Sequence, residues 1–258
     1  MLRLFFGVIL TLTPLTLFAQ GHRGEYELPL NKSLLELPAF VGTDVILFYY
    51  GFVVNYNTEY LIPNWVAYEL TADEVDGDVP RATGFSMDLS YKDRQAMRED
   101  YSNTGWDKGH MAPSADMKWS KAAMSESFYL TNICPQTHEL NGRDWHVLEN
   151  RVRSWARQYG RVWVVCGPIV KERRYGTIGE QGVVVPDKFF KAILRQDEDG
   201  TYQTIAFVFD NDSSRQPLKD AMITVDSLEA LTGYDLFANL DDDVEVVVES
   251  QAYWENWQ

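Results

Sequence analysis

A histidine follows two charged residues and a glycine in the segment Asp-Lys-Gly-His, from Asp107 to His110. A neutral imidazole, with a free pKa of about 6.5, can take a proton from water at physiological pH. Lys108 can attract a phosphate group, and Gly109 can allow a sharp backbone turn. The segment therefore predicts water activation beside a phosphodiester, with His110 as general base. The alternative is a histidine that serves only the structure of a polar loop.

Asn141 and Glu149 could hold a divalent cation from one side of a helix. Eight residues of helix place them about 12 Å apart along the axis and within roughly 80° around it. Both side chains are too short to ligate one ion together without strain. We therefore expect one direct ligand, and one carboxylate that acts through bound water, which suits Mg²⁺ or Mn²⁺. The alternative is a helix cap at Asn141 and a solvated charge at Glu149.

The elements that must position these residues indicate an α+β fold rather than a regular βαβ repeat. The spacing of Trp145, Leu148, Val152, Trp155 and Tyr159 predicts a helix over Asn141–Tyr159. A capping-box pattern from Asp226 to Glu229 predicts a second helix that ends at Gly233. Runs rich in Val, Ile, Phe and Tyr predict strands. These runs are Val45–Tyr56, Trp65–Leu70, Phe128–Ile133, Arg161–Gly167, Val183–Val185 continuing to Phe189–Leu194, Thr204–Phe209 and Val244–Val248.

The charge of the 258-residue chain excludes a uniformly basic coat for nucleic acid. Its formal net charge is −15, and 45% of its residues are hydrophobic, as in ordinary globular proteins. The charge is uneven, because residues 143–174 hold eight basic and three acidic residues, whereas residues 196–258 hold two basic and fifteen acidic ones. The basic segment could attract phosphates, although a solvated helix face explains it equally well.

The N-terminal segment is typical of an export signal. One arginine, Arg3, precedes an apolar run from Leu4 to Phe18, and Ala19 follows it. We therefore expect a signal peptide over residues 1–19, an N-terminal extension over 20–44, one folded domain over 45–258, and a secreted or periplasmic protein with no membrane partner after cleavage. An uncleaved N-terminal anchor is the alternative. In an exported protein Cys134 and Cys166 could pair, or both could be inert buried thiols.

The joint pattern resembles the DNA/RNA non-specific endonuclease family, the ββα-metal nucleases of the Serratia nuclease and endonuclease G type. The residues that carry this resemblance are Asp-Lys-Gly-His at 107–110, Asn132 with Pro135 and Gln136, and Asn141 with Trp145, Leu148, Glu149 and Arg153. Further similarities lie in Arg81 with Phe85 and Asp88, and in segments between residues 45 and 210.

This resemblance implies a mostly antiparallel central sheet flanked by helices, and hydrolysis of DNA and RNA with little sequence preference. His110 would be the general base, Asn141 the only direct protein ligand of one Mg²⁺, and Glu149 the holder of its water cluster. Asn132 and Gln136 would shape the site, Gln136 also contacting substrate. Arg81, Lys108 and Arg153 would bind or neutralise the phosphate, and the products would carry 5′-phosphates. The family usually has arginine where this chain has Lys108. Lysine retains the positive charge but cannot form the paired hydrogen bonds with which an arginine holds a phosphate.

Other functions remain open on the sequence. A nuclease-like scaffold could bind nucleic acid without cutting it, or hydrolyse phosphodiesters other than nucleic acids. A zinc site from Cys134, Cys166, His138 and His146 is compatible in residue type but not in spacing. The sequence does not indicate an oligomeric state.

Overall fold

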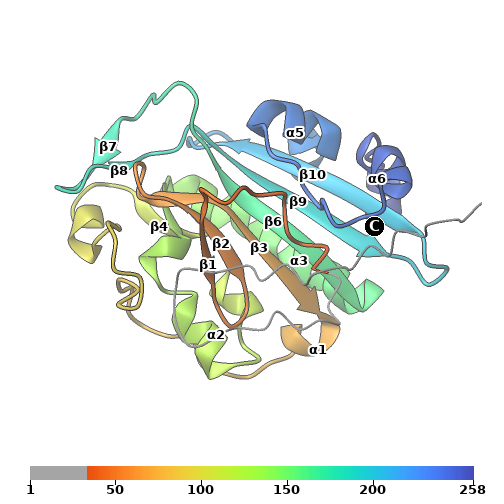
Figure 1. Cartoon of the computed structure of the whole chain (residues 1–258), viewed down its shortest axis with the longest axis horizontal. Coiled ribbons are helices and arrows are strands. Elements are labelled where there is room, and N and C mark those ends of the chain that lie inside the picture. The colour runs from red at the N-terminus through yellow and green to blue at the C-terminus, as the bar shows by residue number, and fades with distance from the viewer. Residues whose placement is uncertain (1–33) are drawn as a thin grey trace, which may run out of the picture.

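The computed structural model describes residues 34–258, and a twisted antiparallel sheet forms its centre (Figure 1). Seven strands of the described part lie in the order β1-β2-β3-β6-β9-β10-β11, and two short ribbons, β4-β5 and β7-β8, stand outside it. The strands are β1 (Val45–Phe48), β2 (Val53–Asn57), β3 (Ile62–Thr71), β4 (Asp107–His110), β5 (Ile133–Gln136), β6 (Arg161–Ile169), β7 (Thr177–Ile178), β8 (Val183–Val184), β9 (Lys188–Gln196), β10 (Tyr202–Asp210) and β11 (Met222–Ile223). The expected α+β class and mostly antiparallel sheet are confirmed.

Helices cover both faces of this sheet, so two apolar cores form (Figure 1). The helices are α1 (Ala72–Val75), α2 (Lys121–Glu126), α3 (Trp145–Tyr159), α4 (Leu218–Ala221), α5 (Val225–Thr232) and α6 (Asp242–Glu249). The core on one face contains the apolar stripe of α3, including Trp145 and Trp155, and the core on the other contains Val225 and Leu228 of α5. No helix of residues 34–258 is long and apolar enough to cross a bilayer.

The helix expected over Asn141–Tyr159 is present, but its first turn is wider than an α-helix. Leu140–Asp144 form a π-helical turn, and the regular α-helix α3 begins only at Trp145. Asn141 and Glu149 are therefore not separated by the angle of roughly 80° that a regular α-helix would give. Wide turns of this kind occur often at functional sites, because they redirect one side chain without ending the helix.

Four strand expectations differ from the structure. Val45–Tyr56 forms the hairpin β1-β2 rather than one strand, because the chain turns between Phe48 and Val53. Phe128–Ile133 is mostly irregular with a 3₁₀ turn over Leu130–Asn132, and only Ile133 enters a strand. The run continuing from Val183 to Leu194 is divided between the separate strands β8 and β9.

Val244–Val248 lies in the helix α6 rather than in a strand. Its valines were consistent with a strand by composition, but three acidic residues in the first turn favour a helix N-terminus. Val244 and Val248 are then neighbours on one half-buried side, while Val246 and Val247 are exposed. The helix expected to be capped by Asp226 is capped by Thr224 instead and begins two residues earlier, at Val225. It ends as expected at Gly233, which has a φ of 80°.

The packed domain begins before residue 45. Leu35 and Leu37 are buried in the core that α5 also contacts, and the Ala39 amide donates to the Asp235 carbonyl. The expected extension is therefore part of the packed structure from residue 34 onward, whereas the signal peptide expected over residues 1–19 lies outside the described residues. Cys134 and Cys166 are both buried free thiols.

Candidate active site

The ribbon of β4 and β5 presents His110 and depends on a close approach between the two strands. His110 is paired with Ile133, and Gly109 with Cys134. A Cβ added at Gly109 would lie 2.2 Å from Oε1 of Gln136, a side chain that is fully buried. Gly109 therefore serves close packing within a strand rather than the sharp turn expected from the sequence.

Asn132 holds the chain that follows His110. Its Oδ1 accepts from the Ala112 amide at 2.9 Å, and its Nδ2 donates to the carbonyls of Ala112 and Ser127, each at 2.9 Å. These three buried hydrogen bonds use both amide hydrogens of Asn132 and its amide oxygen. Asn132 therefore shapes the site by fixing the backbone next to His110.

His110 lies against two aromatic rings, which set its charge. The ring centroids of Phe85 and Phe128 are 5.2 and 4.9 Å from that of the imidazole. Burial, together with the nearby Arg81 guanidinium, lowers the pKa of His110 to about 3. Its Nε2 is buried without a hydrogen-bond partner among the described residues. The imidazole is therefore neutral at physiological pH, which is the state a general base requires.

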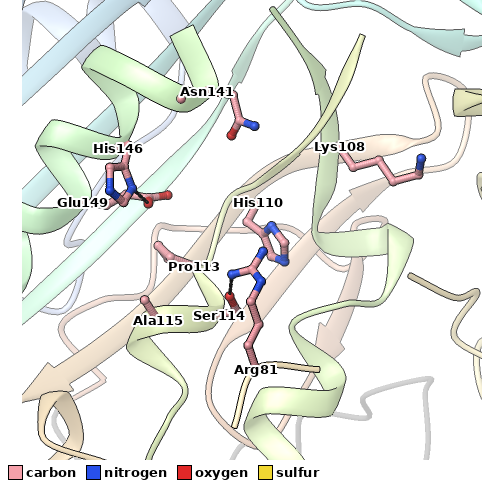
Figure 2. A pocket seen from close by; sticks show the side chains of 10 residues that line it. Arg81, Lys108, His110, Pro113, Ser114, Ala115, Asn141, His146 and Glu149 are labelled. Carbon is pink, nitrogen blue, oxygen red and sulfur yellow. Dashed lines mark hydrogen bonds and ion pairs between the residues drawn. The ribbon is translucent and has the colours of Figure 1, made fainter. Parts of the chain in front are cut away.

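His110 lines a cavity of about 360 Å³ (Figure 2). Five of the residues proposed from the sequence line it together: Arg81, Lys108, His110, Asn141 and Glu149. Pro113, Ser114, Ala115, Gly142 and His146 complete the lining. A pocket that combines cations, a neutral base and two oxygen donors suits an anionic substrate together with a metal ion.

Two basic side chains border the pocket in different ways. The Arg81 guanidinium lies beside the His110 ring, donates to Oγ of Ser114, and is 5.1 Å from the Phe128 ring centre (Figure 2). The Lys108 ammonium lies 5.2 Å from the Tyr101 ring centre, and Figure 2 shows it directed away from Asn141 and Glu149. Burial lowers the pKa of Lys108 below its usual value. Arg81 is thus the cation closer to the reacting position, and Lys108 lies at the rim.

Asp107 orients the proposed metal ligand. Its Oδ2 accepts a hydrogen bond of 2.9 Å from Nδ2 of Asn141, and the same oxygen lies 3.0 Å from Nδ1 of His138. Because the amide nitrogen of Asn141 is held by Asp107, the amide oxygen is left for the pocket (Figure 2). Partners of this kind fix ligand orientation in metal sites.

Glu149 provides the second oxygen donor of the pocket. Its side chain is 13% exposed, and Oε2 lies 3.6 Å from Nδ1 of His146. An amide oxygen and a carboxylate on one wall of a hydrated cavity fit a small hard cation such as Mg²⁺, which keeps several waters. The donor set therefore fits the expected metal ion without assigning its geometry.

Arg153 has a buried acidic partner instead of a place in the pocket lining. Its guanidinium donates to Oδ1 of Asp116 at 2.6 Å and to Oδ1 of Asn150 at 2.7 Å. Asp116 is fully buried and also accepts from the Tyr68 hydroxyl at 2.9 Å. Burial raises the pKa of Asp116, and Arg153 opposes that rise. The pair joins α3 to the turn that begins at Ser114.

Of the proposed residues, Asn132, Gln136 and Arg153 do not line the pocket, although all three support elements that do. The sequence assigned no individual role to Asp107, Asp116 or Ser114, and no pocket role to His146. The four residues of the zinc alternative are not brought together, since the two cysteines are buried and the two histidines are exposed. Asp107 contacts Asn141 across 34 positions, so no local signal could have revealed it.

Similar proteins come from several eukaryotes. The chain is 35% identical over 208 residues to the mitochondrial nuclease EXOG of Danio rerio, covering 75% of this chain and 61% of that protein. It is 32% identical over 229 residues to its human counterpart, covering 82% and 62%. It is also 31% identical over 207 residues to nuclease C1 of Cunninghamella echinulata var. echinulata, covering 74% and 82%. The chain thus spans about three fifths of the length of the EXOG relatives.

The expected secreted or periplasmic location is contradicted by these comparisons. The EXOG relatives are mitochondrial nucleases, as are endonuclease G of Homo sapiens and a nuclease of Saccharomyces cerevisiae that are both 32% identical to this chain. The expectation rested on residues 1–19, which lie outside the described residues. An apolar run with one basic residue is a compositional signal, and it does not identify a compartment by itself.

A solved structure and a family model also match this chain. The EndoG/EndoGI complex structure matches with a TM-score of 0.74 and 27% identity, over 80% of this chain and 91% of the matched chain. The model of the DNA/RNA non-specific endonucleases matches residues 36–243. With His110, Asn141 and Glu149 around one cavity on a ββα-metal fold, the chain belongs to the DNA/RNA non-specific endonuclease family.

Proposed function

We propose that this protein is a metal-dependent endonuclease that hydrolyses DNA and RNA with little sequence preference. The observation that carries the proposal is the single cavity in which a neutral His110 imidazole faces the same space as Arg81, Asn141 and Glu149. The named activities of the relatives, which are nucleases, support the same reaction class.

In this mechanism His110 takes a proton from a water molecule. The water oxygen bonds to phosphorus, and the bond from phosphorus to the 3′ oxygen breaks. The leaving 3′ oxygen takes a proton from solvent water, so the products are a 5′-phosphate and a 3′-hydroxyl. Because water rather than the 2′-hydroxyl of ribose attacks, both DNA and RNA serve as substrates. Arg81 lies next to His110, so its guanidinium is suited to hold the phosphate that the water attacks.

Asn141 and Glu149 would hold the Mg²⁺ ion, or Mn²⁺ in its place, Asn141 through its amide oxygen and Glu149 through bound water. The bound ion would stabilise the negative charge that develops on the phosphate and the leaving oxygen. Arg153 would act through Asp116 and the position of α3, since its guanidinium is already engaged. Phosphate contacts carry no base information, which explains the low sequence preference.

Supercoiled plasmid and structured RNA, each incubated with the protein with and without EDTA, test the proposal. We expect both polymers to be cut in Mg²⁺ and neither in EDTA. His110→Ala should lower turnover at least about 10²-fold with the fold intact, because a general base is lost. His138→Ala, an exposed histidine outside the pocket lining, is the matched control.

Three outcomes would contradict the proposal. Plasmid that is retarded but intact would identify a binding protein. No effect on either polymer would point to another phosphodiesterase. Near-normal cutting by the His110→Ala variant would remove the imidazole from the mechanism.

A further inference from the structure

A second group of oxygen donors lies on the face of the sheet opposite α3. Asp226 and Glu229 of α5 and Glu249 of α6 each offer a carboxylate oxygen, and these oxygens lie within 4.8 Å of one another. Both helices pack on β10, on the side where Val225 and Leu228 are buried, whereas α3 and the catalytic pocket belong to the other side (Figure 1). This acidic cluster (Asp226, Glu229 and Glu249) is therefore separate from the candidate active site.

The two helices bring the three carboxylates together by their positions in the turns. Asp226 and Glu229 are three residues apart in α5, so their side chains share one side of that helix. Glu249 is the last residue of α6. Asp226 is exposed, Glu229 is half-buried and Glu249 is buried, so the cluster opens to solvent at its Asp226 side.

Glu249 lacks the partner that a buried carboxylate requires. Glu249 is only 2% exposed, and its Oε1 has no hydrogen-bond partner within residues 34–258. Glu229 uses Oε1 to accept the Leu236 amide at 2.6 Å, which leaves its second oxygen. An unpaired buried carboxylate is costly, and pairing or a metal ion normally compensates for it.

The charges around Glu249 are all of one sign. No ion pair joins Asp226, Glu229 or Glu249 to a basic residue of the described chain. The charged groups that act on Glu249 are the carboxylates of Glu229, Glu245, Asp226 and Asp235. The arrangement thus lacks a positive charge at the point where the carboxylates converge.

We propose that Asp226, Glu229 and Glu249 bind one Ca²⁺ ion that fastens α6 to α5. Three carboxylates supply only oxygen ligands, which excludes the softer metals that prefer nitrogen or sulfur. Ca²⁺ takes six to eight oxygen ligands in a flexible arrangement, whereas Mg²⁺ requires a near-ideal octahedron at shorter distances. The three carboxylate oxygens lie within 4.8 Å of one another on two separate helices, so a cation with flexible coordination suits them. Water supplies the remaining ligands on the exposed side.

Thermal unfolding and calorimetric titration of the full chain with CaCl₂, both in a fixed excess of Mg²⁺, test this site. We expect one Ca²⁺ per chain, and a rise in Tm of roughly 5 °C at about a hundred times Kd. Glu249→Gln and Asp226→Asn should each abolish the rise. Glu249→Gln should fold without Ca²⁺, because it replaces a buried carboxyl group that lacks a basic partner with a neutral amide of the same shape.

Two controls isolate the cluster. Asp243→Asn removes a charge from the exposed side of the same helix and should retain the Ca²⁺-dependent rise. Glu149→Gln, in the catalytic pocket, should also retain it. A rise that survives Glu249→Gln, or that disappears with Glu149→Gln, would overturn the proposal, as would equal stabilisation by Mg²⁺ or no rise at all. None of these results depends on nuclease activity, so the two proposals succeed or fail separately.

Discussion

The protonation state of His110 follows from its contacts with Phe85, Phe128 and Arg81. An imidazole surrounded by rings and facing a guanidinium loses the solvation that its charged form needs. The sequence indicated an imidazole near its free pKa, but these neighbours, 18 to 29 positions away, lower that pKa substantially. The burial that keeps the His110 imidazole neutral also means that protonating it lowers the free energy of unfolding.

This burial predicts a specific loss of stability in acid. The imidazole has a pKa of about 6.5 in the unfolded chain and about 3 in the folded protein, so the unfolded state binds more protons between these values. The free energy of unfolding should thus fall as pH drops from 6.5 toward 3, with His110 contributing at most about 1.4 kcal/mol per pH unit. Urea unfolding across this range, compared with His110→Asn, measures the contribution. Equal slopes for the two proteins would contradict it.

Asp107 orients the proposed metal ligand Asn141 through one hydrogen bond. Asp107→Ala releases the amide, so Asn141 no longer presents its oxygen to the pocket in one orientation. We expect the Mg²⁺ concentration for half-maximal cutting to rise at least about 10-fold, as for other partners of metal ligands. Asp107→Asn retains an acceptor and should recover part of the affinity. His138→Ala, which removes the other contact of Asp107, should leave the titration unchanged; an unaltered titration in Asp107→Ala would refute this role.

At the scale of elements, the β4-β5 ribbon and the start of α3 fix the two walls of the pocket. The ribbon positions His110 through its pairing with Ile133, and Trp145 of α3 donates to the His110 carbonyl at 3.3 Å. The ribbon and the helix thus meet at the backbone of His110. Any change in the separation of the two strands moves His110 relative to Asn141.

Gly109→Ala tests this dependence, because its new Cβ would collide with Gln136. Overpacking of this kind costs about 1–3 kcal/mol, and we expect lower turnover as well as lower stability. The double variant Gly109→Ala with Gln136→Ala should recover much of both, since the collision is removed. Gly84→Ala, where the added Cβ meets nothing within 4 Å, is the control. Equal losses in the single and double variants would show that the collision is not the cause.

At the scale of the whole molecule, charge is separated between the two faces of the sheet. The basic residues of segment 143–174 include those of α3, whereas the acidic C-terminal quarter contains α5 and α6 on the opposite face. A chain of net charge −15 can therefore still present local cations to a polyanion. Since salt screens such contacts, substrate binding should depend on ionic strength.

We expect kcat/KM on plasmid DNA to fall steeply as the salt concentration rises. Each phosphate contact contributes about −0.9 to the slope of log affinity against log salt concentration on duplex DNA. Arg81→Gln should therefore reduce the magnitude of the slope by up to about 0.9. Arg174→Gln, at an exposed arginine outside the pocket lining, should change it less. A rate that is independent of salt would contradict the role of phosphate contacts.

The sequence by itself determined the family, the α+β class and the residues of the chemical motif. Motif residues have types and spacings that few other functions require, and the stripe of α3 follows a strong helical period. The sequence-based strand predictions were wrong for Val244–Val248 and Phe128–Ile133, where local composition favours strands. Acidic residues in the first turn of α6, and backbone hydrogen bonds of Phe128 and Leu130 to the distant Ser86, decide otherwise. Only the tertiary structure decided the pKa of His110, the orientation of Asn141 by Asp107, the pairing of Arg153 with Asp116, and the acidic cluster of α5 and α6. Each of these depends on contacts between residues far apart in the chain, which no local pattern specifies.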